Sequence, residues 1–280
     1  MIVCKSPEEI ERMRAANELV AAVLTDLGDV IAPGVSTGEL DARAEAKIRA
    51  AGATPAFKGY HQYPATLCVS INDEVIHGIP SATRLLNEGD IVSVDVGAVL
   101  DGFVGDSAVT FPVGRISEEA ALLLRVTQES LYRAILTVKP GGRVSDIGDA
   151  VQRHVEAQGG SVVREFVGHG IGTAMHEEPQ VPNYGPPGRG ARLTEGMVLA
   201  IEPMVNLGRP AVRVLGDGWT AVTRDHSLSA HFEHTVAVTA EGPFVLTARG
   251  DERFDEVLAS AGLATPDGVE TRWRKRTRLK

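Results

Sequence analysis

The sequence predicts an α+β protein built from two related halves. Residues 86–95 (LNEGDIVSVD) match residues 193–202 (LTEGMVLAIE) without a gap, and the offset of 107 residues makes Asp95 and Glu202 equivalent positions. The same offset pairs further positions inside helical patterns: Pro33 with Pro140, Leu40 with Ile147, Ile48 with Val155, and Gly52 with Gly159. A period this long is not that of a solenoid and indicates a duplicated α+β unit.

This repeat predicts the domain organisation. We expect one domain over residues 1–248, with halves of about 6–111 and 112–248 facing each other across a pseudo-twofold axis. A ligand site between the halves follows from that arrangement. The remaining residues, 249–280, form a C-terminal extension that contains a short amphipathic stretch and then a basic tail.

Each half is expected to begin with helices. Ser6 is an N-cap with proline at the first helical position and Glu9 as the capping-box glutamate, and Ser36 with Glu39 repeats this pattern before a second helix. In the second half, Ser117 caps the counterpart of the first helix, and another helix follows Val144. Apolar residues recur at helical spacing in the first helix, at Ile10, Met13, Leu19, Val20, Val23, Leu24 and Leu27.

The composition is that of an ordinary globular protein. Hydrophobic residues make up 43% of the 280 residues, which is enough for a large core and excludes a disordered or fibrous chain. No run of about 18 apolar residues and no signal-peptide pattern occurs, so we expect a cytoplasmic protein without membrane contact. Two cysteines, Cys4 and Cys68, are too few for a disulfide framework or a four-cysteine zinc site.

Two β-rich runs, residues 91–100 and 103–111, are joined by Asp101-Gly102, a pair favoured in type I′ hairpin turns. With such a turn Asp106 lies opposite Gly97, and Asp95 is a diagonal neighbour on the same face, roughly 7 to 8 Å away. The valines at 92, 94 and 96 face the other side as core. The strand therefore reserves space beside two carboxylates, and the repeat gives Glu202 the same setting.

Several carboxylates in an apolar setting require a cation, a proton or many hydrogen bonds, because an unpaired buried charge is costly. A pair of divalent ions about 3.5 to 4 Å apart, with a bridging hydroxide as nucleophile, is a recognised hydrolytic arrangement that meets this requirement. Salt-bridged strand ends would explain any one of these residues, but not the whole set.

Two further segments complete the set. His169 lies in Gly-His-Gly-Ile-Gly, where glycines permit close backbone approach around an imidazole. Glu233 lies in a strand, Ala-His-Phe-Glu-His-Thr-Val, in which alternation places His234 on the opposite face, as a hydrogen-bonded core histidine. His231 shares the face of Glu233 and is interpreted only as its neighbour.

These residues closely resemble the type I methionine aminopeptidases over roughly residues 6–246. The resemblance is carried by Asp95, Asp106, the glycine-rich segment around His169, Ile-Glu-Pro-Met at 201–204 and Phe-Glu-His-Thr at 232–235. It implies the pita-bread fold, in which antiparallel sheet from two pseudo-symmetric halves is covered by helices. It also implies a monomeric, cytoplasmic exopeptidase that removes the initiator methionine from nascent proteins and peptides when the second residue is small.

The resemblance assigns roles to the acidic residues and His169. Asp95 would chelate one metal ion, Asp106 and Glu233 would bridge both, and His169 and Glu202 would hold the other. The ions would be Co, Mn, Fe or Zn, since a set rich in carboxylates is harder than most zinc-only sites. The bridging hydroxide would attack the scissile carbonyl, and Glu202 would pass its proton to the leaving amine.

The resemblance also identifies substrate contacts. His176 would stabilise the tetrahedral intermediate, and His77 would contact the substrate main chain and assist proton transfer. Without the resemblance, each histidine would be read as structural. The methionine side chain would enter an apolar slot near Tyr60, Tyr63, Cys68, Phe166 and Trp219, with Phe57 and Met175 at positions where family members vary.

Two other functions remain open on the sequence. Prolidases and proline-specific aminopeptidases share the five ligands but carry a large additional N-terminal domain, whereas about 90 residues precede Asp95 here. A non-catalytic pita-bread protein could instead bind the ribosome through the basic tail, but the complete ligand set argues against this. The tail, with Arg272, Arg274, Lys275, Arg276, Arg278 and Lys280, could also hold an active enzyme transiently near ribosomal RNA, although a plain solvated terminus is the preferred interpretation.

Overall fold

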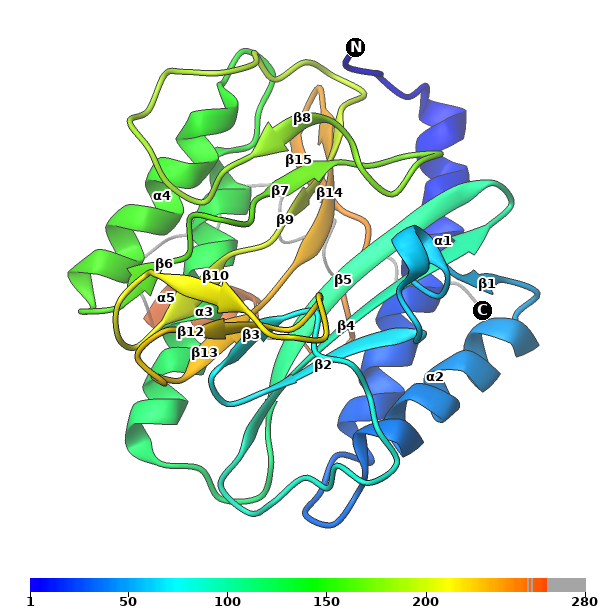
Figure 1. The fold of residues 1–280 in the computed structure, drawn as a ribbon. Coiled ribbons are helices and arrows are strands. Elements are labelled where there is room, and N and C mark those ends of the chain that lie inside the picture. The colour runs from blue at the N-terminus through cyan, green and yellow to red at the C-terminus, as the bar shows by residue number, and fades with distance from the viewer. Residues whose placement is uncertain (251, 253, 261–280) are drawn as a thin grey trace.

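Each half of the computed structural model contributes two long helices and antiparallel strands (Figure 1). The structure describes residues 1–250, 252 and 254–260. The helices are α1 (Pro7–Gly28), α2 (Thr37–Ala50), α3 (Glu118–Thr137), α4 (Val144–Ala157) and α5 (Phe254–Ser260), with a 3-10 turn at Tyr60–Gln62. The first-half strands are β1 (Thr54–Pro55), β2 (Leu67–Ile71), β3 (Glu74–Ile76), β4 (Ile91–Leu100) and β5 (Phe103–Pro112).

The second half carries shorter strands. They are β6 (Ser161–Val162), β7 (Gly168–Gly170), β8 (Glu177–Val181), β9 (Val198–Ile201), β10 (Met204–Asn206), β11 (Val212–Val214), β12 (Ala221–Thr223), β13 (Ser229–His231), β14 (His234–Thr239) and β15 (Gly242–Val245). The main second-half sheet has the order β15-β14-β9-β7-β8, and every pairing in it is antiparallel. The α+β prediction is therefore confirmed.

The repeat appears directly in the element boundaries. Helices α2 and α4 have the same length, and both of their ends differ by the 107 residues that separate Asp95 from Glu202. Strands β1 and β6 are related by the same offset. The sequence similarity thus corresponds to a repeated order of elements, α2 then β1 and α4 then β6.

The predicted helix starts are found where the capping residues stand. Ser6 accepts a hydrogen bond from the backbone N–H of Glu9 at 3.2 Å, and the Glu9 carboxylate accepts one from the Ser6 N–H at 2.8 Å. Ser36 and Glu39 make the same reciprocal pair before α2. These bonds satisfy N–H groups that the first turn of a helix leaves without partners, so local residues fix where each helix begins.

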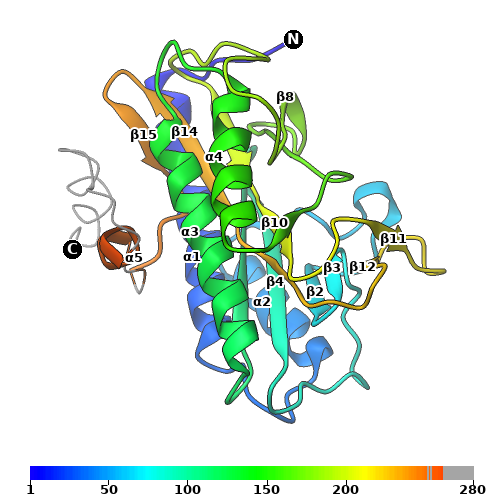
Figure 2. The same cartoon turned by 90° about the vertical axis from the view of Figure 1, so that its left-hand side faces the viewer.

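The helices cover one side of the sheets, and β3, β11 and β12 lie on the opposite side (Figure 2). Val92, Val94 and Val96 of β4 are completely buried in the core cluster that also contains Val20, Leu24 and Leu27 of α1. The alternate residues of β4, Ser93, Asp95 and Gly97, face away from α1. The core therefore holds the hairpin so that its carboxylates point to the other side.

Close packing between β5 and α1 depends on Gly105. A Cβ at this position would lie 2.7 Å from the carbonyl carbon and oxygen of Ala16, which belong to the helix backbone. We expect Gly105→Ala to lower the free energy of unfolding by roughly 1 to 3 kcal/mol, as other overpacked sites do. Urea denaturation measures this change. Gly216→Ala is the matched control, since a Cβ there meets no atom within 4 Å, and an equal loss in both variants would contradict the packing argument.

The first residues of the C-terminal extension are packed into the protein. Arg249 and Phe254 are buried, and the Phe254 ring lies 4.7 Å from that of Tyr132 on α3. The Glu252 carboxylate accepts hydrogen bonds from the Tyr132 hydroxyl at 3.0 Å and from Arg249 at 2.9 Å. The basic tail predicted at 272–280 lies outside the described residues. Among the described residues, no helix has the length and apolar character needed to cross a membrane.

Candidate metal centre and substrate pocket

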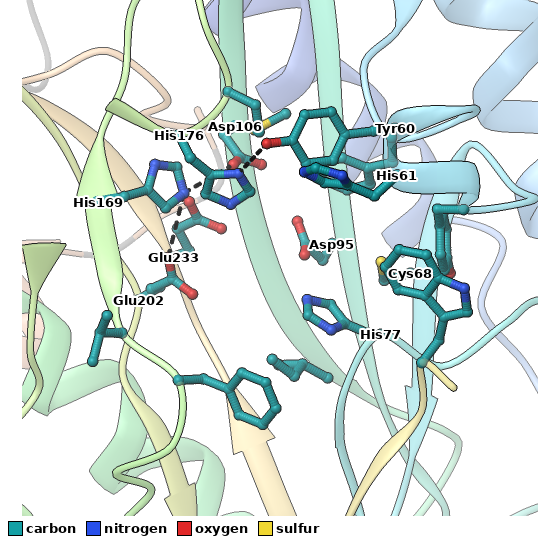
Figure 3. Close-up of a pocket in the computed structure, with 17 residues that line it drawn as sticks. Tyr60, His61, Cys68, His77, Asp95, Asp106, His169, His176, Glu202 and Glu233 are labelled. Carbon is teal, nitrogen blue, oxygen red and sulfur yellow. Dashed lines mark hydrogen bonds and ion pairs between the residues drawn. The ribbon is translucent and has the colours of Figure 1, made fainter. Parts of the chain in front are cut away.

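A single cavity of about 290 Å³ brings the predicted site residues together (Figure 3). Figure 3 shows Asp106, Glu202, Glu233 and His169 gathered at one side and Cys68 at the other, with Asp95 between them. The lining includes every residue that the sequence assigned to the metal site or the substrate contacts, namely Tyr60, Tyr63, Cys68, His77, Asp95, Asp106, Phe166, His169, His176, Glu202, Trp219 and Glu233.

The hairpin places its two carboxylates as expected. Asp106 pairs with Gly97 across β4 and β5, and Asp101 and Gly102 have φ of 50° and 80°, as a type I′ turn requires. A Cβ at Gly97 would lie 2.7 Å from the Phe57 ring and 2.9 Å from the Met175 methyl group. The missing side chain therefore provides room for two residues that line the pocket.

The second half supplies His169 on β7. A Cβ at Gly168 would lie 2.3 Å from the carbonyl oxygen of Ala200, and one at Gly170 would lie 2.3 Å from that of Glu178. The flanking glycines thus allow β7 to fit between β8 and β9, as the glycine-rich pattern indicated. His169 is the central residue of this three-residue strand.

The His169 ring is held in one tautomer. Its Nδ1 lies 2.9 Å from the carbonyl oxygen of Gly170, which can only accept, so Nδ1 carries the proton. Its Nε2 lies 3.5 Å from Glu202 Oε1 and 3.8 Å from Asp106 Oδ2. Burial lowers the pKa of His169 to about 4, so Nε2 presents a lone pair to two carboxyl groups near pH 7. Such an arrangement requires a cation or protons among these atoms.

Hydrogen bonds across the two halves hold the carboxylates side by side. The backbone N–H of Glu233 donates to the carbonyl oxygen of Ala108 at 2.9 Å, and the Ser107 hydroxyl donates to the carbonyl oxygen of Glu233 at 2.6 Å. The Thr235 hydroxyl donates to the carbonyl oxygen of Asp106 at 2.8 Å. We call these bonds the seam, and they fix Asp106 of one half beside Glu233 of the other.

The donor set fits a divalent metal. Asp106, His169 and Glu233 each offer a buried ligand atom, and these atoms lie within 4.8 Å of one another. One oxygen each of Asp95, Asp106 and Glu233 is buried and has no hydrogen-bond partner among the residues that the structure describes. Burial raises the pKa of Asp95 to about 7 and those of Asp106, Glu202 and Glu233 well above their usual range, with neighbouring carboxylates adding to the effect in the last three. A bound cation would satisfy the oxygens and permit ionisation.

Metal binding at pH 7 is expected to release protons. The carboxyl groups must ionise to bind metal, whereas His169 is already neutral and contributes no proton. Because the pKa of Asp95 is raised to about 7 and that of Asp106 is raised well above its usual range, metal affinity should increase as pH rises from 6 to 8. Calorimetric titration with Mn²⁺ in two buffers of different ionisation enthalpy would show a buffer-dependent heat. Equal heats in both buffers would contradict the inferred protonation.

Two further histidines border the cavity. His176 Nδ1 lies 2.7 Å from the Tyr60 hydroxyl, and its ring centre lies 4.4 Å from that of His169. His77 contacts the rings of Phe166 and Trp219 edge-on, at centre distances of 5.7 and 6.2 Å. Burial lowers the pKa of His77 to about 4 and also lowers that of His176. Both rings are therefore neutral near pH 7 and can donate or accept a hydrogen bond.

An apolar slot adjoins the carboxylates. The Tyr63 hydroxyl lies 2.9 Å from the carbonyl oxygen of Leu67 and 3.0 Å from that of Gly78, which holds its ring in place. Trp219 packs edge-on against Tyr63 at a centre distance of 5.0 Å. Cys68, paired with Asp95 across β2 and β4, is buried beside them, and burial raises the pKa of its thiol. The slot is therefore rigid and uncharged.

The structure also places residues that the sequence did not assign to the pocket. His61 lines it and has φ of 46°, and Ile76 and Val167 also contribute to the wall. His61 could have been found from its place between the two tyrosines of the pocket motif; the aliphatic pair carries no such signal.

The two histidines near Glu233 differ in their contacts. His231 is 2% exposed, its Nε2 lies 3.9 Å from Glu202 Oε2, and neither ring nitrogen has a hydrogen-bond partner in the described part of the chain. His234 bonds to Thr247 and Glu252, each at 2.9 Å, which confirms it as a satisfied core histidine.

Comparison with known proteins supports a metal-dependent peptidase. The model of metallopeptidase family M24 matches residues 11–240. Methionine aminopeptidase 1 of Bacillus subtilis (strain 168) is 53% identical over 247 residues, covering 88% of this chain and 99% of the relative. The methionine aminopeptidase of Escherichia coli (strain K12) is 48% identical over 259 residues, covering 92% and 98%.

A solved structure gives the same result. The crystal structure of methionine aminopeptidase from Thermotoga maritima superposes with a TM-score of 0.87 at 48% identity, covering 88% of this chain and 99% of that one. The chain belongs to metallopeptidase family M24. Within this family it falls among the type I-like methionine aminopeptidases, and its fold is the pita-bread fold that the resemblance implied.

Proposed function

We propose that this protein removes the N-terminal methionine from nascent polypeptides and peptides whose second residue is small. The observation that carries the proposal is the apolar slot beside a buried group of carboxyls, some of whose oxygens have no hydrogen-bond partner among the described residues. The slot suits an uncharged side chain, and the cluster of carboxyl groups suits a metal ion that promotes hydrolysis of a peptide bond. The similarity to methionine aminopeptidases over most of the chain supports the choice of methionine.

Two divalent ions would be held by the five predicted ligands. Asp95 would bind one ion, Asp106 and Glu233 would contact both, and His169 and Glu202 would bind the other. When bound, such ions polarise a carbonyl group and supply a hydroxide nucleophile at neutral pH. The four carboxyl groups favour Mn, Fe or Co over a zinc-only site, although Zn also fits a mixed set of this kind.

The protein's own residues orient the substrate and move protons. Neutral His176, held by the Tyr60 hydroxyl, would donate a hydrogen bond to the carbonyl oxygen as negative charge develops there. His77 would contact the substrate main chain near the slot. Glu202, whose pKa is raised by burial and by the nearby carboxylate of Asp95, is suited to accept a proton and return it to the leaving amine.

Specificity for methionine would come from the slot. Tyr60, Tyr63, Cys68, Phe166 and Trp219 would surround an unbranched side chain, and none carries a charge that would select a polar residue. The methionine side chain fits a narrow apolar cavity because it is flexible and unbranched. Preference for a small second residue is proposed from the family rather than from a contact.

Peptide hydrolysis tests this function. Protein stripped of metal by a chelator would be supplied with Mn²⁺ or Co²⁺ and incubated with Met-Gly-Met-Met, Met-Leu-Met and a Gly-Pro peptide. Metal-dependent release of methionine from the first peptide alone is expected. Cleavage before proline would instead support a prolidase-like activity, and inactivity with Mn²⁺, Co²⁺, Fe²⁺ and Zn²⁺ would support a non-catalytic binding protein.

The cellular setting follows from the substrate. Nascent chains present their initiator methionine in the cytoplasm, where we place the protein as a monomer with one catalytic domain over 1–248 and an extension over 249–280. The six basic residues of 272–280 would attract ribosomal RNA transiently through their charge. If a chain ending near residue 249 sediments with ribosomes at low salt as well as the intact chain does, this last proposal fails.

A further inference from the structure

The arm that precedes α1 is anchored beside the active-site cavity by Lys5. The backbone N–H of Lys5 donates to the carbonyl oxygen of Gly196 at 2.7 Å. Its ammonium group donates to Glu177 Oε2 at 2.5 Å and also lies 3.3 Å from the carbonyl oxygen of Val3. The Lys5 side chain is 4% exposed and that of Glu177 is 12% exposed, so this is a largely buried ion pair between residues 172 positions apart.

The protein leaves room for this lysine. A Cβ at Gly172 would lie 2.4 Å from Lys5 Cε, and a Cβ at Gly196 would lie 2.6 Å from the Lys5 carbonyl oxygen. A side chain at Gly172 would therefore displace the ammonium end of Lys5, and one at Gly196 would displace the backbone of the arm. Buried ion pairs are weak stabilisers, and apolar residues of similar size often serve stability equally well. The Lys5–Glu177 ion pair is therefore better explained by the conformation that it imposes on the segment around Glu177 than by a gain in stability.

Glu177 connects Lys5 to the turn that carries His176. Its second carboxylate oxygen, Oε1, accepts hydrogen bonds from the backbone N–H groups of Thr173 at 2.9 Å and Ala174 at 3.2 Å. One carboxylate thus binds the ammonium group on one side and closes the 173–177 turn on the other. His176 lies in this turn, directly before Glu177, and its ring must reach the Tyr60 hydroxyl at 2.7 Å while lying beside His169.

We propose that Lys5 is a positioning residue for His176 and acts through the carboxylate of Glu177. This inference rests on the proposed function, since it assigns Lys5 to the reaction in which His176 contacts the substrate. Lys5 does not line the cavity, and its ammonium group bonds to Glu177 and Val3 rather than to a candidate ligand, so its loss should disturb the orientation of His176 and leave the candidate ligands in place.

Kinetics of Lys5→Met and Lys47→Met variants test the proposal. Lys47 is the matched control, because it is a lysine on α2 that bonds to the carbonyl oxygen of Ala22, and it does not line the cavity. For Lys5→Met we expect kcat/KM for Met-Gly-Met-Met to fall by roughly 10- to 100-fold, as for other residues that orient a functional group. The loss should lie mainly in kcat, and calorimetric Mn²⁺ affinity should stay within about twofold of wild type, because the lost contact acts on the transition state.

A double-mutant cycle separates positioning from a general structural role. In a His176→Ala background, Lys5→Met should cause no further loss of kcat/KM, because the group that it orients is absent. An equal loss in both backgrounds, or a parallel loss of Mn²⁺ affinity, would overturn the proposal. If Lys5→Met fails to fold, Lys5→Met with Glu177→Gln removes both charges, and wild-type activity in that variant would overturn it as well.

A spectroscopic measurement keeps the inference independent of the proposed function. The imidazole ¹⁵N shifts of His176 report the hydrogen bond between Nδ1 and Tyr60, whether or not the protein cleaves peptides. We expect these shifts to change in Lys5→Met and to remain as in wild type in Lys47→Met. Inactive wild-type protein would refute the function alone, whereas unchanged His176 shifts in Lys5→Met would refute the positioning role alone.

Discussion

Asp106→Asn is expected to abolish peptide hydrolysis while making the metal-free protein more stable. Asp106 lies among candidate ligand atoms of both halves and has a buried oxygen with no hydrogen-bond partner in the described part of the chain. Asparagine preserves its shape but cannot supply the carboxylate that is proposed to bridge two metal ions, so we expect activity to fall by roughly 10³-fold or more, since a metal would provide several kcal/mol of transition-state stabilisation. The pKa of Asp106 is raised by burial and by the carboxylates of Asp95 and Glu202, so an amide removes a group that is costly to ionise.

Activity assays and thermal unfolding in chelator would measure both effects. The sign of the stability change follows from the raised pKa: Asp106 favours the folded state at low pH, and this contribution is lost as pH rises. The gain in melting temperature from Asp106→Asn should therefore be larger at pH 8 than at pH 5. Asp101→Asn in the turn of the same hairpin is the control and should keep activity, because Asn-Gly also suits a type I′ turn. A lower melting temperature for metal-free Asp106→Asn would contradict this account.

His176→Ala is expected to lower kcat/KM by roughly 10²- to 10⁴-fold, which is the range for a positioned acid or hydrogen-bond donor. The ring faces the cavity beside His169 and is oriented by Tyr60. It is absent from the group of candidate ligand atoms around Asp106. The loss should therefore appear in the chemical step while metal affinity is retained.

Steady-state kinetics combined with Mn²⁺ calorimetry would separate these two quantities. His226→Asn is a suitable control because His226 is exposed, pairs with Asp73 and has φ of 59°, which asparagine tolerates. Metal affinity that falls together with kcat/KM would show that His176 supports the metal centre rather than the substrate.

Local signals in the sequence were sufficient for much of the fold and of the site. The register of the β4–β5 hairpin followed from Asp101-Gly102, because a two-residue turn fixes every pair along both strands. The capping boxes at Ser6 and Ser36 fixed two helix starts for a similar reason. These predictions succeeded because each depends on residues only a few positions apart.

Contacts between distant segments were not predictable in the same way. The sequence contains no local pattern that pairs Lys5 with Glu177 or brings Glu252 to His234. It also gave no indication that His231 would lie beside Glu202 with neither ring nitrogen bonded to another described residue. These contacts arise from packing of distant segments. They include the Lys5–Glu177 ion pair, on which the proposed positioning of His176 depends.

The seam between β5 and residues 233–235 has a thermodynamic consequence. Its hydrogen bonds hold Asp106 of the first half beside Glu233 of the second half. A cation held by both residues can therefore bind only when the two halves are docked. Docking and occupancy are then linked equilibria, and the resistance of the folded chain to unfolding increases with the logarithm of the free metal concentration. The supply of metal would govern the lifetime of the protein as well as its turnover.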